Sequence, residues 1–166
     1  MTEPDRPIVL SYGGGIDTVA LITLVLEGRL PRPETIVMAD TARERQATWD
    51  YLDEVVQPAL ARVGLRVEIA PHDLSAVDLI ADNGDLLIPV FTETGKLPTF
   101  CSSEWKQRVV RRWLRARGYG PERPIIEWLG FNLDEVQRLR KSDVAWIERQ
   151  YPLCVMPETR MRRHEA

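Results

Sequence analysis

Three consecutive glycines, Gly13, Gly14 and Gly15, stand between a β-favouring run and an apolar run of helical length, and Asp17 and Thr18 follow them. Glycines let a backbone approach a ligand closely and leave its N–H groups available. A helix that begins at this point adds a field that favours anions. The pattern therefore predicts a phosphate-binding turn, although neither G-x-x-x-x-G-K-S/T nor G-x-G-x-x-G is present.

The acid that follows this turn indicates a cation. Asp17 would repel a bare phosphate, so Asp17 together with Thr18 points to Mg²⁺ and a polyphosphate. Two simpler interpretations stay open at this stage. Asp17 could cap the N-terminus of the next helix, and the glycines could form a plain strand-to-helix connection.

The elements that must position these residues alternate along the chain. Strands are expected at 8–11, 35–39, 65–70 and 125–129. Helices are expected at 17–27, 43–63, 102–117 and 133–140. Gly28, Gly64 and Gly118 follow three of these helices as stop signals, and Pro58 should kink the second helix. The alternation predicts one α/β domain over residues 1–166, a parallel twisted sheet of Rossmann-like type with helices on both faces.

In such a sheet, ligands bind at the carboxyl ends of the strands. This rule places the glycine turn, Asp40 with Thr41, and the segment 130–132 along one edge. Asp40 ends the second expected strand, where it could accept from ribose hydroxyls or cap the next segment. Residues 73–100 break the pattern, and we interpret them as a substrate-facing insertion or lid, with a disordered surface loop as the alternative.

The glycine turn resembles a known family motif. The run G-G-G-I-D-T at 13–18 is similar to the PP-loop, S-G-G-x-D-S, of the adenine nucleotide alpha hydrolase-like superfamily, whose fold is of the HUP type. Thr18 keeps the last hydroxyl of that motif, whereas Gly13 lacks the first. Ser11, two residues earlier, is a candidate replacement for this donor to phosphate.

Later segments resemble the phosphoadenylyl-sulfate reductase-like branch, including its phage and bacterial members. They are A-D-T-A-R-E at 39–44, G-K at 95–96 with C-S-S-E-W-K at 101–106, L-G-F-N-L-D-E-V-Q-R at 129–138, and Y-P-L at 151–153 with T-R at 159–160. Their order and spacing fit nearly the whole chain. The resemblance implies an adenine nucleotide-binding protein.

The resemblance also implies an activity, in which Mg-ATP is cleaved between its α and β phosphates to adenylylate a substrate oxygen. A nitrogen or sulfur nucleophile then displaces AMP. The implied roles are pyrophosphate binding by the glycines and Thr18, Mg²⁺ binding by Asp17, ribose or adenine contacts near Asp40, Thr41 and Gly130, and charge compensation by Lys106 and Arg138. From the residues alone, Lys106 could be a solvated helix charge, and Arg138 could pair with Asp134 one turn away.

Cys101 supports a second interpretation. Cys101 could carry sulfur or attack an activated substrate, as in a reductase or sulfurtransferase acting on an adenylyl-sulfate, or it could be a buried structural thiol. Cys154 is expected in the core. Two cysteines cannot ligate a four-iron cluster within one chain. His72 and His164 show no recognisable metal-site spacing with them.

Related chains often continue past the T-R element into a cysteine-containing segment. We therefore expect either a minimal enzyme or one half of a split enzyme that a partner chain completes. A third interpretation, from another class, is a nucleotide-binding or partner-binding module without turnover. We also expect self-association as a homo-oligomer.

Composition sets the remaining expectations. The chain has 166 residues and a net charge of -3, which gives no global attraction to nucleic acid or membranes. No apolar stretch is long enough to span a bilayer, and the acidic start M-T-E-P-D is unlike a signal peptide, so a cytoplasmic location is expected. Five arginines form a basic strip that could meet a nucleic-acid substrate, although a solvated helix face is the simpler interpretation. They are Arg108, Arg111, Arg112, Arg115 and Arg117.

Overall fold

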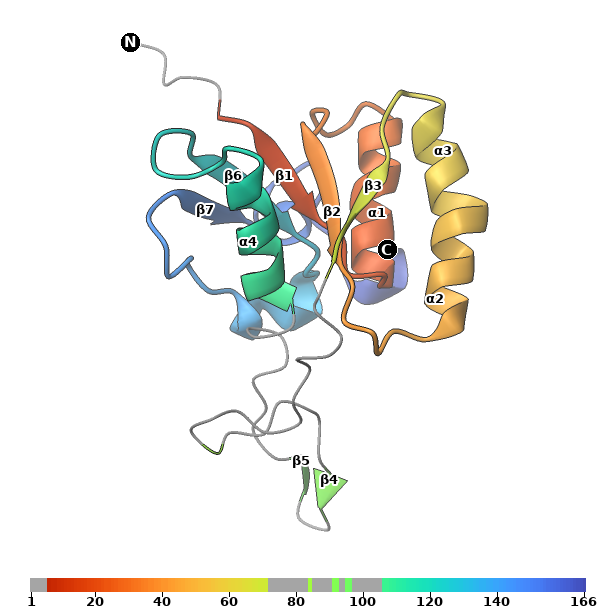
Figure 1. Ribbon diagram of the computed structural model, residues 1–166. Coiled ribbons are helices and arrows are strands. Elements are labelled where there is room, and N and C mark those ends of the chain that lie inside the picture. The colour runs from red at the N-terminus through yellow and green to blue at the C-terminus, as the bar shows by residue number, and fades with distance from the viewer. Residues whose placement is uncertain (1–5, 72–83, 85–90, 93–94, 97–105) are drawn as a thin grey trace.

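A computed structural model of the chain describes residues 6–71, 84, 91–92, 95–96 and 106–166. Its centre is a parallel sheet of five strands in the order β3-β2-β1-β6-β7 (Figure 1). These strands are β1 (Ile8–Ser11), β2 (Thr35–Ala39), β3 (Val67–Ala70), β6 (Ile125–Leu129) and β7 (Ile147–Gln150). The chain moves outward from β1 to β3 and then returns to the other side of β1, so the strand order reverses between β1 and β6. This is the predicted Rossmann-like fold class.

Helices cover both faces of the sheet (Figure 1). One face carries α1 (Ile16–Leu26) and a continuous helical segment made of α2 (Gln46–Tyr51), the π-helical turn η1 (Leu52–Val56) and α3 (Gln57–Ala61). The opposite face carries α4 (Arg108–Ala116). The remaining elements are the antiparallel pair β4 (Phe91–Thr92) and β5 (Gly95–Lys96), the 3-10 helix η4 (Leu133–Arg138), α5 (Pro152–Val155) and η5 (Arg163–Glu165).

Two apolar cores lie on the two faces because successive strand residues point to opposite sides. On the α1 side, Leu10 and Trp128 pack with Leu21 and Leu60. On the α4 side the strands contribute Val9, Val37 and Ile125, and α4 contributes Val109, Val110, Trp113 and Leu114. Val109 and Trp113, four residues apart, are both buried and form the apolar face of this helix.

Several predicted boundaries need correction. The strand expected at 65–70 begins only at Val67. The helix expected at 43–63 contains a π-helical turn directly before Gln57 and Pro58, where proline has no N–H for the α-helical ladder. The helix expected at 133–140 is a 3-10 helix with a kink at Glu135. The strand β7 and the helix α5 were not predicted.

The positive φ angles of Gly28, Gly64 and Gly118, at 71°, 68° and 84°, confirm the three predicted helix stops. Most of the predicted insertion at 73–100 lies outside the described residues, and so do Cys101 and His72. No helix in the described ranges is long and apolar enough to cross a membrane.

Candidate functional site

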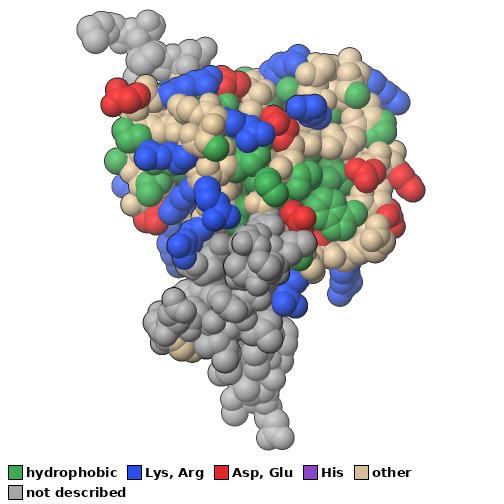
Figure 2. Space-filling model, in the orientation of Figure 1, with side chains coloured by type: hydrophobic (Ala, Val, Ile, Leu, Met, Phe, Trp, Pro, Cys, Tyr) green, Lys and Arg blue, Asp and Glu red, His purple; other side chains and the backbone are tan. Residues whose placement is uncertain are grey.

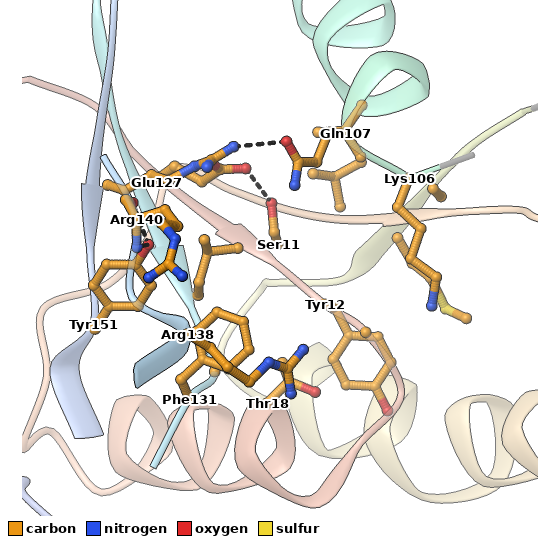
Figure 3. Close-up of a pocket in the computed structure, with 18 of the residues that line it drawn as sticks. Ser11, Tyr12, Thr18, Lys106, Gln107, Glu127, Phe131, Arg138, Arg140 and Tyr151 are labelled. Carbon is orange, nitrogen blue, oxygen red and sulfur yellow. Dashed lines mark hydrogen bonds and ion pairs between the residues drawn. The ribbon is translucent and has the colours of Figure 1, made fainter. Parts of the chain in front are cut away.

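A cavity of about 350 Å³ opens at the carboxyl ends of β1, β2, β6 and β7, beside the point where the strand order reverses (Figure 3). This is where ligands bind in open α/β sheets, and the volume lies within the usual range of ligand sites. Its wall includes six of the predicted site residues. They are Ser11, Gly13, Thr18, Lys106, Gly130 and Arg138.

The glycine loop presents backbone N–H groups at this edge. Gly15 is the N-cap of α1, and the N–H groups of residues 13–17 donate to no other described residue. Gly14 has a φ of 70°, and a Cβ atom there would lie 2.5 Å from Thr48 Cγ2. Glycine is therefore required at position 14 for both its φ and its close approach, and the loop leaves amides available for an anion.

Asp17 does not cap α1, so that simpler interpretation was wrong. The residue is 7% exposed, and its Oδ1 accepts a hydrogen bond from Asn132 Nδ2 at 2.9 Å. Thr18 donates its hydroxyl to the Gly15 carbonyl at 2.8 Å and borders the cavity, whereas Asp17 is not among the residues that line it. The acid thus lies behind the loop rather than in the open cavity.

Asn132 lies at the predicted edge of the sheet, but the sequence analysis assigned it no role. It is fully buried, donates to Asp17 and accepts from the Asp134 N–H at 2.8 Å, which makes it the N-cap of η4. One amide side chain therefore joins the loop after β6 to the start of α1. Its place between a predicted strand that ends at residue 129 and the acidic pair Asp134 and Glu135 was the available sequence signal.

Asp40 and Thr41 follow β2 at the same edge but do not line the cavity. Asp40 Oδ1 accepts from the Ala42 N–H at 2.8 Å, in a turn where Ala42 has a φ of 55°. Thr41 is 3% exposed, and its hydroxyl lies 3.5 Å from Glu44 Oε1. The part of this segment that borders the cavity is Val37 to Ala39 and Glu44.

Both predicted cations border the cavity, and each has an acidic partner. Lys106 Nζ lies 3.0 Å from Glu44 Oε1. Arg138 pairs with Glu135, three residues earlier, and its Cζ lies 4.6 Å from the centre of the Phe131 ring. The alternative interpretation, an ion pair of Arg138 with Asp134, was therefore wrong in its partner. Both cations remain close enough to respond to an anionic ligand in the cavity.

Asp134 instead accepts from the Arg163 N–H and from Arg162 Nη1, both at 3.0 Å. The backbone bond from Arg163 is the main cause that lowers the pKa of this carboxyl, and Arg162 adds to it. These two hydrogen bonds join the segment after α5 to the start of η4.

A buried polar network in the cavity wall was also not predicted. Ser11 Oγ donates to Glu127 Oε1 at 2.9 Å, Arg149 Nε donates to Glu127 Oε2 at 3.1 Å, and Arg149 Nη2 donates to Gln107 Oε1 at 2.9 Å. Figure 3 draws the bonds to Ser11 and Gln107. The Glu127 and Arg149 side chains are each 8% exposed. The hydroxyl of Ser11 is thus directed to Glu127 in this structure. A glutamate inside an otherwise apolar strand was the signal for this network.

Cys154 is buried, as predicted, and its Sγ lies 2.9 Å from the Phe131 carbonyl oxygen. Burial raises the pKa of this thiol, with smaller contributions from Asp17 and Glu135. Across the ranges that the structure describes, no three His, Cys, Asp or Glu side chains form a group that could hold a metal ion.

The basic strip of α4 is partly neutralised. Arg111 pairs with Asp143, Arg117 Nη2 lies 3.4 Å from Glu68 Oε2, and Arg115 lies over the Trp146 ring. Figure 2 shows Lys and Arg side chains gathered on the α4 side of the face in view. These contacts are typical of a solvated helix face whose arginines pair with side chains of adjacent segments.

No protein-family model and no curated protein matches the sequence. Among solved structures, the chain is similar to the U34-tRNA thiolase NcsA from Methanococcus maripaludis with its 4Fe-4S cluster, at 18% identity and a TM-score of 0.46. The match covers 93% of this chain and 54% of that one, so this chain spans about half the length of the thiolase. A likeness at this level carries no argument about activity, and the fold class rests on the order and direction of the five strands.

Proposed function

We propose that this chain binds Mg-ATP in the cavity and cleaves it between the α and β phosphates to adenylylate an acceptor. The observation that carries the proposal is the convergence of unused loop N–H groups, the N-terminus of α1 and two flexible cations on one cavity at the strand switch point. Backbone donors of this kind bind phosphate oxygens, and the cations add charge.

In the proposed reaction, an oxygen of the acceptor attacks the α phosphorus. A new oxygen–phosphorus bond forms as the bond to the β phosphate breaks, and pyrophosphate leaves. The loop N–H groups and Lys106 stabilise the negative charge that accumulates on this leaving group. A nitrogen or sulfur nucleophile then displaces AMP from the acceptor carbon. One candidate acceptor is a base in a nucleic acid.

The residues present fit a magnesium ion that is held largely by the phosphates. Asp17 does not line the cavity, but its Oδ2 accepts no hydrogen bond from a described residue, so we propose this oxygen as the protein ligand that reaches the ion from beside the loop. Protein-bound Mg²⁺ commonly uses one or two carboxylates together with substrate phosphates and water. When bound, the ion would neutralise phosphate charge next to a carboxylate that otherwise repels it.

The proposal is tested by ligand binding and by product analysis. Melting temperatures of the wild type and of Asp17→Asn are measured with ATP, with and without Mg²⁺, and with adenosine 3′,5′-bisphosphate. A ligand at about 100 times its dissociation constant adds roughly 2.7 kcal/mol to stability, which is readily detected. Arg112→Gln, an exposed α4 residue outside the cavity wall, is the matched control.

We expect a shift with Mg-ATP that Asp17→Asn loses and Arg112→Gln keeps. ATP labelled at its α phosphate should then yield labelled AMP when candidate acceptors are added. A shift with the bisphosphate alone would favour the reductase-like alternative that uses Cys101. Tight Mg-ATP binding with no pyrophosphate release under any condition would favour a module without turnover.

A further inference from the structure

We propose that Arg149 forms a second anion subsite in the cavity, which binds an acidic group of the acceptor. The group would be a carboxylate, sulfate or phosphate on a molecule that binds at the same time as ATP. This inference rests on the proposed function for the presence of an acceptor. It assigns that acceptor a chemical class, namely a compound with a negatively charged oxyanion.

The guanidinium of Arg149 is held in place on two sides. Its Nε donates to Glu127 Oε2 at 3.1 Å, and its Nη2 donates to Gln107 Oε1 at 2.9 Å. Glu127 is itself fixed, because its Oε1 accepts from Ser11 Oγ at 2.9 Å. The arginine is therefore oriented by residues of β1 and β6 and by the N-cap residue of α4 before any ligand arrives.

The orientation leaves donors for a ligand. Arg149 borders the cavity, and its Nη1 donates to no described residue. A planar guanidinium recognises oxyanions through paired N–H bonds, and preorganisation reduces the entropy lost on binding. A buried ion pair is also a weak source of net stability, so its position in a cavity wall favours a recognition role.

The charges around Arg149 favour an anion. The described wall residues include four cations and two carboxylates, and Lys106 pairs with Glu44 as Arg149 does with Glu127. Arg140, which follows η4, donates to the carbonyls of Gln137 and Leu139, and no described carboxylate pairs with it. The β7 side of the cavity therefore has an excess of positive charge. Figure 3 shows Arg140 and Glu127 on the same side of the cavity, away from Lys106 and Tyr12.

The subsite is distinct from the glycine loop. The loop follows β1 and Arg149 lies on β7, with β6 between them. The carboxylate of Glu127 on β6 stands between the two, because one of its oxygens bonds to Ser11 of β1 and the other to the Arg149 guanidinium. An anion at Arg149 would therefore belong to a different group from the pyrophosphate that the loop holds.

The test uses inorganic sulfate as the probe, in isothermal titration calorimetry at constant ionic strength. Sulfate is titrated into the full chain alone and into the chain saturated with magnesium and α,β-methylene ATP, which cannot be cleaved at the proposed bond. Calorimetry is preferred to melting-temperature measurements because sulfate is excluded from protein surfaces and so stabilises proteins without binding to them. Glu127→Gln, the double variant Glu127→Gln/Arg149→Gln and the control Arg112→Gln are compared with the wild type.

We expect sulfate to bind the nucleotide-saturated wild type and the Arg112→Gln control equally. Glu127→Gln removes the competing carboxylate and should bind sulfate several-fold more tightly. The double variant, which leaves no unpaired buried charge, should bind it about tenfold more weakly or worse. Should Glu127→Gln fail to fold, Arg149→Lys replaces it, and its affinity should lie between those of the wild type and the double variant.

Three results would overturn the subsite. They are an absence of sulfate binding to the wild type, competition between sulfate and the nucleotide analogue, and an unchanged affinity in the double variant. Failure of the proposed function is recognised separately. The analogue would then not bind, whereas Arg149-dependent sulfate binding to the protein alone would persist.

Discussion

Gly130 packs against the first turn of α1 so closely that a Cβ atom at this position would lie 2.7 Å from Thr18 Cγ2 and 2.9 Å from Thr18 N. The loops after β1 and β6 therefore meet through a bare backbone. This contact closes one wall of the cavity and brings the glycine loop beside the residues that follow β6.

The change Gly130→Ala should force these loops apart. We expect a loss of about 1–3 kcal/mol in the free energy of unfolding, measured by urea denaturation, and weaker Mg-ATP binding. Gly13→Ala is the matched control for stability, because its Cβ would have no neighbour within 4 Å and its effect should stay within about 0.5 kcal/mol. Equal losses in the two variants would contradict this assignment.

Asp17 should have separable structural and ligand-binding roles. Asp17→Ala leaves the buried Nδ2 of Asn132 without its acceptor and should destabilise the protein by about 1–3 kcal/mol. Asp17→Asn keeps an oxygen for that bond, so it should retain stability while it removes the Mg²⁺ dependence of ATP affinity. Urea denaturation and calorimetry with and without Mg²⁺ distinguish these effects. The role would be purely structural if Asp17→Asn kept the magnesium dependence.

Glu44 should compete with ATP for Lys106. The change Glu44→Gln frees the ammonium group and is expected to strengthen Mg-ATP binding about two- to fivefold, whereas Lys106→Met should weaken it. The Lys106 side chain is 44% exposed, so both effects should shrink as salt increases. Calorimetry at two salt concentrations measures how the Mg-ATP affinity of each variant changes with ionic strength. Lower affinity in Glu44→Gln would show that Glu44 contacts the ligand directly.

Cys154 should make stability fall at alkaline pH. Burial raises the pKa of this thiol in the folded state, so the unfolded chain loses the proton first, above about pH 8.5. The unfolded state then binds fewer protons than the native state, and the free energy of unfolding decreases as pH rises. Urea denaturation at pH 7 and pH 9.5 under reducing conditions should show a smaller decrease for Cys154→Ala than for the wild type.

The comparison of wild type with Cys154→Ala also controls for the ionisation of two buried tyrosines. The pKa values of Tyr12 and Tyr119 are also raised by burial, and their ionisation lowers stability at still higher pH in both proteins. The difference between wild type and variant therefore isolates the thiol. Parallel curves over this pH range would show that Cys154 contributes nothing to the pH dependence.

The central strands could be predicted from sequence because each is a short run of buried apolar residues. The bounds of β1, β2 and β6 agree with the predicted strands at every residue. In contrast, β7 has the sequence I-E-R-Q, in which only Ile147 is apolar. At the edge of the sheet, polar partners replace apolar packing, and the hydrophobic pattern that identifies a strand is absent.

The candidate site could be predicted only where the signal is local. The glycine loop, Lys106 and Arg138 were recognised from short motifs, and the structure places them around one cavity. The roles of Glu127 and Arg149 depend on their bond to each other and on the bond of Glu127 to Ser11, which lies 116 positions earlier. Pairings over such separations depend on the sheet register, which no local pattern contains.

Those separations have a consequence for how the protein is made. The bonds from Ser11 to Glu127 and from Asn132 to Asp17 join residues 116 and 115 positions apart, so each closes a loop that includes most of the chain. Contacts between residues far apart in the sequence form late, because the chain must lose the entropy of the long loop before the contact can stabilise it. A nascent chain on the ribosome would present its glycine loop early but complete the cavity, and with it the proposed nucleotide site, only after β6 and β7 had emerged. Cotranslational nucleotide binding would then report the completion of folding rather than its beginning.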